Sequence, residues 1–308
     1  MPRHACLLAV FAGAAATHCV TKQPYVCESL ISDAEAEKLS RAEGALDGVP
    51  TLDEALQSLP AAERAGRGAL LEAALSRYPA VHAAQLKLFE RGDANARVVH
   101  SSVFHGLGNR EQALISAFAL ALATDAALLI DWGRRGCDGY AAGKVTDCDL
   151  YRFTDLFEPP PFNWRYHPPE HLHIKKRTLG EKDVTLAIKH SATLADVVRG
   201  IAFESADSQG LFVAMVQLRT DHYFLKRVMC HASMRTSRLF PDLPLVQARL
   251  ERYLLRPKDD ILRMAKNAVR SAGGCAVGVH LRHHEAYATV HKSSRCRVDG
   301  VEVDATAP

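Results

Sequence analysis

Hydrophobic and polar residues follow one another along the chain in blocks that favour an α/β fold. Residues 98–104 form a short run rich in valine, which is typical of a strand. Residues 114–122 then place large apolar side chains at helical spacing, and residues 126–130 form a continuous apolar run that ends before Asp131 and Trp132. This order of strand, glycine turn, helix and strand predicts two parallel strands joined by a right-handed crossover.

Further patterns lie on both sides of this unit. Thr51 and Glu54 have the spacing of a capping box, so we expect a helix to begin there. Pro244 begins another helical pattern, which Pro257 ends, and a second one follows directly. Residues 275–282 are again apolar and are expected to begin a buried strand. The sequence therefore predicts an α/β protein with a Rossmann-like parallel sheet.

Changes in composition divide the chain into four segments. Residues 1–16 have a weakly basic start and an apolar run that ends in alanines, which is typical of a secretory signal peptide. Residues 17–96 are expected to form a helical N-terminal segment, residues 97–274 the Rossmann-like domain, and residues 275–308 the start of a further domain. A buried N-terminal helix or strand is the alternative for the first segment. A poorly ordered stalk is the alternative for the second.

Composition and charge narrow the class of protein. The chain has 308 residues, of which 48% are hydrophobic and 24% charged, as in globular proteins of about two domains. The formal net charge is only +3, so the charge balance predicts no nucleic-acid partner. No apolar run reaches the roughly 20 residues of a spanning helix, so a signal peptide is a better interpretation of the N-terminus than an anchor.

The eight cysteines fit a secreted or luminal chain, in which most would form disulfides. Removal of residues 1–16 would take Cys6 with it and leave an odd number, so at least one cysteine lacks a partner in this chain. Cys137 and Cys148 flank a glycine-containing stretch that a disulfide could close. The sequence has no CxxC motif, which argues against a zinc knuckle or a thioredoxin-like site.

The first candidate site is the turn after the first strand, which consists of Gly106, Leu107, Gly108, Asn109 and Arg110. Glycines let the backbone approach a ligand closely, and free N–H groups at the start of a helix attract an anion such as a diphosphate. The turn matches neither the dinucleotide fingerprint nor the P-loop. A tight turn without a ligand therefore remains the alternative.

The second candidate site lies where the last apolar run ends, at His280, Arg282, His283 and His284. Ligands bind at the carboxyl ends of parallel strands, and an arginine there can make two hydrogen bonds to a phosphate. Alternation along a strand places His280, Arg282 and His284 on one face and His283 on the other. A histidine metal cluster in a metal-dependent hydrolase and an exposed basic strand end are the alternatives.

Several motifs in the same order give the chain a family resemblance. Residues 104–110, Phe-His-Gly-Leu-Gly-Asn-Arg, and residues 128–132 resemble the start of the catalytic region in plant and algal xyloglucan fucosyltransferases. Residues 155–164 look like the Leu-Phe-Cys-Glu-Pro-Phe-Pro segment of that family, although the cysteine is missing here. Residues 277–282, Val-Gly-Val-His-Leu-Arg, resemble the arginine motif of the wider fucosyltransferase group.

The resemblance implies the GT-B architecture of two facing Rossmann-like domains, with residues 97–274 on the acceptor side and residues 275–308 as the start of a truncated donor-binding domain. It implies an inverting transfer of L-fucose from GDP-fucose to a cell-wall or glycoprotein glycan, with no metal or other cofactor required. The expected partners are GDP-fucose and a glycan acceptor. The expected location is the secretory pathway, in the Golgi lumen or at the Golgi membrane, with a possible luminal membrane association.

By position, the resemblance makes Arg282 the catalytic residue that holds the donor diphosphate, with His280 and His283 as donor-binding neighbours. The turn from Gly106 to Arg110 would line the cleft opposite. The chain departs from the family where Glu111 and Gln112 replace apolar residues, and it ends soon after Arg282, so we expect little transfer by this chain alone. A non-catalytic glycan- or partner-binding remnant is the alternative. Residue type leaves five candidates for the catalytic base: Asp125, Asp131, Glu158, Asp221 and Glu285.

Overall fold

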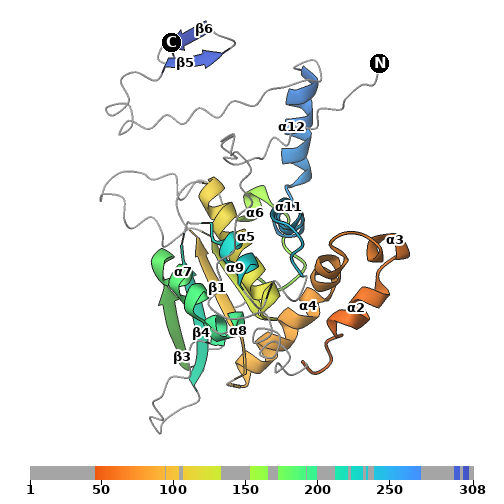
Figure 1. Ribbon diagram of the computed structural model, residues 1–308, viewed down its shortest axis with the longest axis vertical. Coiled ribbons are helices and arrows are strands. Elements are labelled where there is room, and N and C mark those ends of the chain that lie inside the picture. Colours follow the sequence, from red (N-terminus) through yellow and green to blue (C-terminus); the bar gives the residue numbers. More distant parts are fainter. Residues whose placement is uncertain are drawn as a thin grey trace. The chain divides into compact units, whose positions relative to one another are not determined.

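The computed structural model describes residues 46–93, 95–103, 107–132, 153–165, 173–191, 193–199, 212–220, 223–231, 234, 239–271, 295–298 and 301–304 (Figure 1). The chain divides into two compact units. One comprises Thr17–Met264, and the other comprises Met1–Ala16 with Ala265–Pro308. In the second unit the described residues form the end of α12 and an antiparallel pair of strands, β5 (Arg295–Val298) and β6 (Val301–Asp304).

The first unit is built on a four-stranded parallel sheet with the strand order β2-β1-β4-β3. Its strands are β1 (Val98–Val103), β2 (Ala127–Trp132), β3 (His173–Leu179) and β4 (Phe212–Arg219). The helices are α2 (Leu52–Ser58), α3 (Ala61–Arg64), α4 (Ala69–Glu90), α5 (Leu107–Ala123), α6 (Phe153–Leu156), α7 (Glu181–His190), α8 (Leu194–Arg199), α9 (Leu225–Cys230), α11 (Leu243–Leu254) and α12 (Asp259–Ser271). The predicted α/β class and the parallel β1–α5–β2 unit are confirmed.

Two of the predicted helix starts are confirmed by their capping hydrogen bonds. At α2, the Thr51 backbone N–H donates to Glu54 Oε2 at 2.7 Å, and the Glu54 N–H donates to Thr51 Oγ1 at 3.2 Å. At α11, Asp242 Oδ1 accepts from the Leu245 N–H at 2.9 Å, and Pro244 occupies the first turn. Each capping hydrogen bond joins residues three positions apart, so the local sequence was sufficient to predict where these two helices begin.

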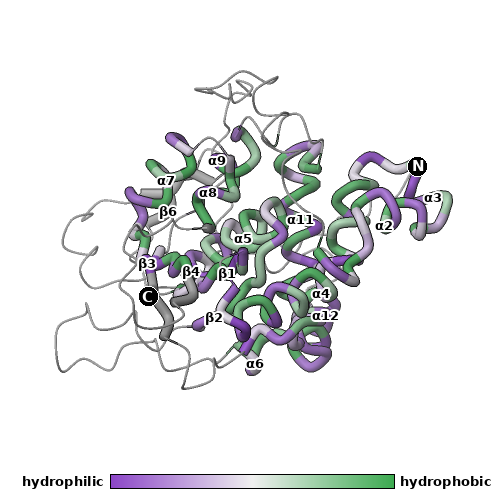
Figure 2. Tube along the Cα trace, turned by 90° about the horizontal axis from the view of Figure 1, so that it is seen from below, coloured by the Kyte–Doolittle hydropathy of each residue, from purple (hydrophilic) through white to green (hydrophobic). Residues whose placement is uncertain are grey.

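The two faces of the sheet are packed by different elements. Because side chains alternate along a strand, Val99, Leu128 and Val216 share one face, which belongs to the larger core together with α5. Val98, Ala127, Leu129 and Met215 lie on the other face and pack with Leu86 and Phe89 near the end of α4. Figure 2 shows hydrophobic residues along much of α4 and α5. The sheet is therefore covered on both faces where β1 and β2 lie, as parallel sheets require.

The helix α4 joins the sheet to the segment that precedes it. Leu71, Leu75 and Tyr78, in its first half, are buried in the larger core, and Leu86 and Phe89, in its second half, belong to the smaller one. The Tyr78 ring meets Phe118 of α5 edge-on, with ring centroids 5.0 Å apart. Part of segment 17–96 is thus integral to the core of segment 97–274.

Tyr78 also fixes the start of β2. Its Oη donates to the Ala126 carbonyl oxygen and accepts from the Leu128 N–H, both at 3.0 Å. Burial raises the pKa of Tyr78 well above its ordinary value, so the hydroxyl remains a donor. One buried side chain therefore satisfies two backbone groups at the amino end of this strand.

A second set of polar contacts surrounds Asp125, which has a left-handed backbone (φ 47°) just before β2. Arg77 of α4 forms an ion pair with its carboxylate at 2.6 Å. Gln85 Nε2 donates to the Asp125 carbonyl oxygen at 2.7 Å, while Gln85 Oε1 accepts from the Arg97 N–H at 2.8 Å. Arg97 in turn donates to the Thr124 carbonyl oxygen at 2.8 Å. The amino ends of β1 and β2 are held together by these side chains.

Some features predicted from the sequence lie outside the described residues. These are the signal peptide at residues 1–16, the Cys137–Cys148 disulfide and the strand at 275–282, which stay predictions. Cys230, at the end of α9, is disulfide-bonded in the structure. None of the described helices is both long and apolar enough to cross a membrane.

Candidate functional site

The carboxyl ends of three neighbouring strands meet at one edge of the sheet. Ser102 of β1 pairs in register with Asp131 of β2 on one side and with Arg219 of β4 on the other. Paired residues of parallel strands point to the same face, so the three side chains form a row. In open α/β sheets ligands bind at this edge, which makes it the candidate functional site.

Within this row, the Ser102 hydroxyl donates to Asp131 Oδ2 at 3.2 Å. Ser102 is buried, Asp131 is half-buried and Arg219 is exposed. Asp131 was among the candidate bases from the sequence, whereas Ser102 and Arg219 were missed. The sequence pattern did not predict a strand at residues 212–219. It therefore gave no indication that Arg219 lies at this edge of the sheet.

Arg110 lies next to this edge, in the first turns of α5. Its side chain is buried, with 5% of the residue exposed, and its guanidinium carbon lies 5.6 Å from the ring centroid of Trp132. Such a cation–π contact stabilises a desolvated guanidinium. Burial lowers the pKa of Arg110 from its ordinary value, yet an arginine remains charged near neutral pH. A fixed positive charge therefore lies behind the glycine turn.

Trp132 is the last residue of β2 and holds this charge in place. Its ring meets those of Phe153 and Phe157 edge-on, with centroids 5.3 and 6.0 Å away. The indole Nε1 is buried and has no hydrogen-bond partner in the described part of the chain. A buried donor without a partner costs free energy, and such groups are rare in native proteins. Trp132 therefore combines a structural contact with a donor that has no partner among the described residues.

The described residues of the glycine turn differ in their exposure to solvent. Helix α5 begins at Leu107, which is exposed, as is Asn109, whereas Gly108 is half-buried and Arg110 is inside. The first backbone N–H groups of a helix have no partner within it and favour negative charge. The start of α5 therefore combines an exposed Asn109 with a buried Arg110 in a region where helices in general favour negative charge.

The other predicted site residues are distributed as follows. Gly106, His280, Arg282, His283, Asp221 and Glu285 lie outside the described residues. Asp125 lies at the opposite end of β2, where it pairs with Arg77, so its position is structural. Glu158 lies on the loop after α6, where its backbone N–H donates to the Arg256 carbonyl oxygen at 2.8 Å. Within the described ranges, no three His, Cys, Asp or Glu residues lie close enough together to hold a metal ion.

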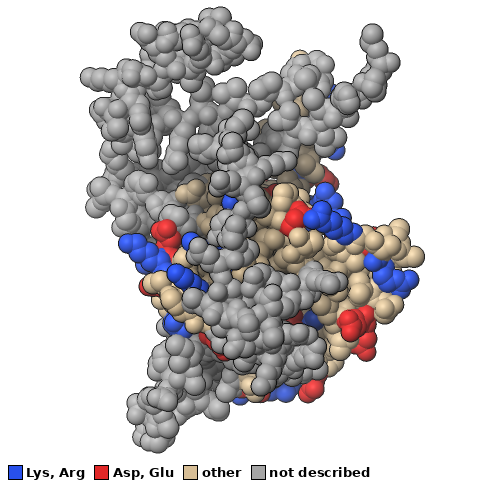
Figure 3. All heavy atoms as spheres, in the orientation of Figure 1, with Lys and Arg blue, Asp and Glu red and all other residues tan. Residues whose placement is uncertain are grey.

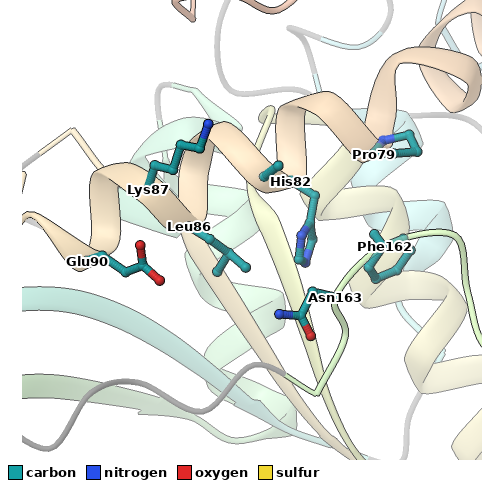
Figure 4. Close-up of a pocket in the computed structure, with 8 residues that line it drawn as sticks. Pro79, His82, Leu86, Lys87, Glu90, Phe162 and Asn163 are labelled. Carbon is teal, nitrogen blue, oxygen red and sulfur yellow. The ribbon is translucent and has the colours of Figure 1, made fainter.

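A separate pocket of about 400 Å³ lies between α4 and the loop that carries Phe162 and Asn163 (Figure 4). His82 points from α4 toward this loop, with its Nε2 3.0 Å from the Leu128 carbonyl oxygen. Burial lowers the pKa of His82 to about 4, so the ring is neutral near pH 7 and donates this hydrogen bond. The His82 ring also packs against that of Phe162, with centroids 4.7 Å apart. Both residues are thus engaged in the fold.

The charges of the described residues do not separate by sign on the face shown in Figure 3, where basic and acidic side chains are interspersed. Two positive side chains lie near the candidate site, Arg110 over the Trp132 ring and Arg219 beside Ser102.

Comparisons with known proteins give two similarities, while no family model matches the chain. The chain is 29% identical over 171 residues to a galactoside 2-alpha-L-fucosyltransferase of Pisum sativum, a match that covers 51% of this chain and 29% of the pea protein. It is also similar to the solved structure of an Arabidopsis thaliana FUT1 mutant in complex with GDP, with 18% identity and a TM-score of 0.43. That match covers 65% of this chain and 48% of the Arabidopsis chain, so the chain spans under half the length of either protein.

Proposed function

We propose that this chain is part of a fucosyltransferase-like glycosyltransferase of the GT-B type that transfers L-fucose from GDP-fucose to a glycan hydroxyl with inversion. The observation that carries the proposal is the 29% identity to the pea fucosyltransferase over 171 residues. The glycine turn with its buried arginine, placed at the ligand-binding edge of a parallel sheet, supports it. The acceptor glycan and the luminal location belong to the same proposal.

The reaction makes specific demands on the site. The acceptor oxygen attacks C1 of fucose from the side opposite the diphosphate, the bond from C1 to the diphosphate oxygen breaks, and GDP leaves with its electron pair. A base takes the proton of the acceptor hydroxyl. Negative charge grows on the diphosphate in the transition state, so fixed cations and N–H donors accelerate the reaction by binding that state more tightly.

The described residues meet part of these demands. In this proposal the start of α5 would bind the diphosphate through backbone N–H groups, and the buried Arg110 would add positive charge nearby. Asp131, at the carboxyl end of β2, is the base that we propose for this proton, because ligands of parallel sheets bind at that edge. By resemblance, Arg282 would bind the diphosphate with His280 and His283, and arginine would supply the charge that other transferases take from a metal.

The test is calorimetric binding of GDP-fucose and GDP to the 308-residue protein. We expect Arg282→Ala to weaken binding at least about 10-fold, and Arg282→Lys to weaken it nearly as much, because an ammonium lacks the two-pronged geometry of a guanidinium. The matched control is Arg263→Ala on α12, where Arg263 is exposed. Equal affinity in all four proteins would contradict the role of Arg282.

A transfer assay separates the enzyme from its alternative. Radiolabelled GDP-fucose and galactose-bearing xyloglucan fragments are incubated with the protein, and labelled glycan is counted. Label in the glycan supports the transferase. A protein that binds the glycan fragments but neither binds GDP-fucose nor transfers label would instead be a non-catalytic glycan-binding protein.

A further inference from the structure

The pocket between α4 and the loop after α6, here called the α4 pocket, combines an apolar wall with polar groups at its edge (Figure 4). Phe162 and Asn163 line it from the loop. One face of α4 lines it with residues at helical spacing: Pro79, His82, Ala83, Leu86, Lys87 and Glu90. Its volume of about 400 Å³ falls within the range of about 300–1,000 Å³ that is usual for small-molecule sites. The α4 pocket is therefore large enough for a small ligand.

The buried side chains of the α4 pocket are held in place by the fold. His82 is 1% exposed and Leu86 is 6% exposed. The His82 ring is fixed on one side by the hydrogen bond to the Leu128 carbonyl oxygen at 3.0 Å and on another by the Phe162 ring, with centroids 4.7 Å apart. Ordering flexible side chains costs free energy on binding, and these side chains are already ordered.

The hydrogen bond to Leu128 also decides what His82 offers to a ligand. A neutral imidazole carries its proton on one nitrogen only, and a carbonyl oxygen can only accept. Burial lowers the pKa of His82 to about 4, so near pH 7 its proton is on Nε2, which donates to Leu128. Nδ1 is then an acceptor. Any hydrogen bond between His82 and a ligand must therefore be donated by the ligand.

Three exposed polar side chains lie at the edge of the α4 pocket: Lys87, Glu90 and Asn163. Within the described ranges, none of the three makes a side-chain hydrogen bond or an ion pair, so all three are available to a ligand. Figure 4 shows that Glu90, like His82, extends from α4 toward the side of Asn163, whereas Lys87 extends away from it. The carboxylate accepts hydrogen bonds, and the Asn163 amide both donates and accepts them.

These groups select against several classes of ligand. An anion would meet the Glu90 carboxylate and the acceptor nitrogen of His82. A planar aromatic ligand needs a free ring face for stacking, but the Phe162 ring already contacts those of His82 and Phe118, with centroids 4.7 and 6.2 Å away. A metal ion needs several ligands, and the described residues contain no cluster of three His, Cys, Asp or Glu. The chemistry that fits is an uncharged, non-aromatic ligand with hydroxyl groups.

We propose that the α4 pocket binds one sugar ring of a carbohydrate, with C–H groups of the ring against Ala83 and Leu86 and hydroxyl groups hydrogen-bonded to Glu90 and Asn163. Both kinds of contact are needed, because a sugar ring has apolar C–H groups as well as hydroxyls that donate and accept. The site is separate from the carboxyl edge of the sheet. Leu128, which His82 contacts, lies three residues before Asp131, or roughly 10 Å along β2. The proposal therefore does not depend on the transferase activity.

The first test fills the α4 pocket. Binding of methyl β-galactoside and methyl β-glucoside to the full chain is measured at pH 7 by saturation-transfer NMR and titration. We expect Ala83→Leu to weaken binding at least about 10-fold, because Ala83 lines the pocket and the larger side chain occupies it. The matched control is Ala62→Leu, since Ala62 is exposed on α3 and lies outside the pocket. Equal affinity in the two variants, or no binding by the wild type, would overturn the proposal.

The second test removes the polar contacts at exposed positions, where the fold tolerates substitution. We expect Asn163→Ala and Glu90→Gln each to weaken binding of the glycosides by about 3–10-fold, as the loss of a hydrogen bond predicts. Glu63→Gln on α3 is the control and should bind as the wild type does. Unchanged affinity in both pocket variants would contradict the proposed hydrogen bonds.

Two further probes test the class of ligand. Butylammonium and inorganic phosphate are added to the glycoside complex as competitors. We expect neither to displace the glycoside, because the pocket offers no isolated charge of either sign. Displacement by either ion would overturn the assignment to a sugar. No measurement involves GDP-fucose or transfer, so failure of this proposal is distinct from failure of the proposed function.

Discussion

The two ends of the β1–β2 pair differ in what their polar side chains contact: α4 binds the backbone at the amino ends, whereas the carboxyl ends carry a row of side chains along the sheet edge. At the amino ends, Tyr78, Arg77 and Gln85 of α4 each make hydrogen bonds or an ion pair to the segment that leads into β2. At the carboxyl ends, the buried Trp132 Nε1 has no hydrogen-bond partner among the described residues, which at the amino ends is true of Arg77 Nε as well. Polar groups that the chain satisfies itself stabilise the fold. Those it leaves unsatisfied cost stability and are typical of functional sites.

Two arginines show the same difference. Arg77, at the amino end, forms a 2.6 Å ion pair with Asp125, a partner fixed by the turn before β2. Arg110, at the carboxyl end, is more deeply buried than Arg77 and lies over the ring of Trp132. The first contact is an ion pair and the second a cation–π contact, so the two guanidinium groups are held by different kinds of partner.

The largest effect on stability is expected from Tyr78→Phe. The change leaves the Ala126 carbonyl and the Leu128 N–H without their buried partner and should cost about 2–4 kcal/mol of unfolding free energy. Urea unfolding followed by circular dichroism measures this loss. The control is Tyr223→Phe, which removes one hydrogen bond between half-buried side chains and should cost about 1 kcal/mol or less. Equal losses in the two variants would contradict the role given to the amino ends.

An intermediate effect on stability is expected from Arg77→Met. The change should lower the free energy of unfolding by about 1–3 kcal/mol at pH 7, which is less than for a fully buried ion pair, because 40% of the Asp125 side chain is exposed. Burial already raises the pKa of Asp125 above 3.8, and loss of Arg77 raises it further. In the folded variant, the Asp125 carboxyl therefore binds a proton more tightly than it does in the unfolded chain. Its deficit relative to the wild type should therefore shrink as the pH falls toward 4.

Urea unfolding at pH 7 and pH 4 tests this dependence. Arg67→Met is the matched control, because Arg67 pairs with Asp242 at 3.2 Å but has 75% of its side chain exposed. Exposed ion pairs contribute little, so this variant should lose about 0.5 kcal/mol or less at either pH. A deficit of Arg77→Met that does not change with pH would show that its packing, and not its charge, stabilises the amino ends.

The smallest effect on stability is expected from Trp132→Phe, at about 1 kcal/mol or less. The smaller ring still contacts Arg110, Phe153 and Phe157, while the N–H without a partner is removed, so lost packing and relieved desolvation offset each other. Urea unfolding followed by circular dichroism measures the change. If Trp132→Phe lost as much unfolding free energy as Tyr78→Phe, Trp132 would be a structural residue. The amino and carboxyl ends of the β1–β2 pair would then not differ in this respect.

The sequence identified those parts of the site that depend on neighbouring residues. The glycine turn lies between β1 and α5, and Asp131 and Trp132 end β2, as the local pattern predicted. The pattern could not place Arg110 inside, because its exposure depends on Trp132, which lies 22 positions later in the printed sequence. Glu111 departs from the apolar residues of the resembled family, and the structure places it half-buried in the first turns of α5.

By itself, the sequence determined the α/β class, the β1–α5–β2 unit and the starts of α2 and α11, because alternation, helical spacing and capping residues act within a few positions. Only the tertiary structure decided that β4 lies between β1 and β3, which brings Arg219 beside Ser102. The tertiary structure also decided that Tyr78 of α4 forms hydrogen bonds to the backbone at the start of β2. These contacts join residues far apart in the chain, and their free energy comes from burial shared by many side chains, which no local pattern records.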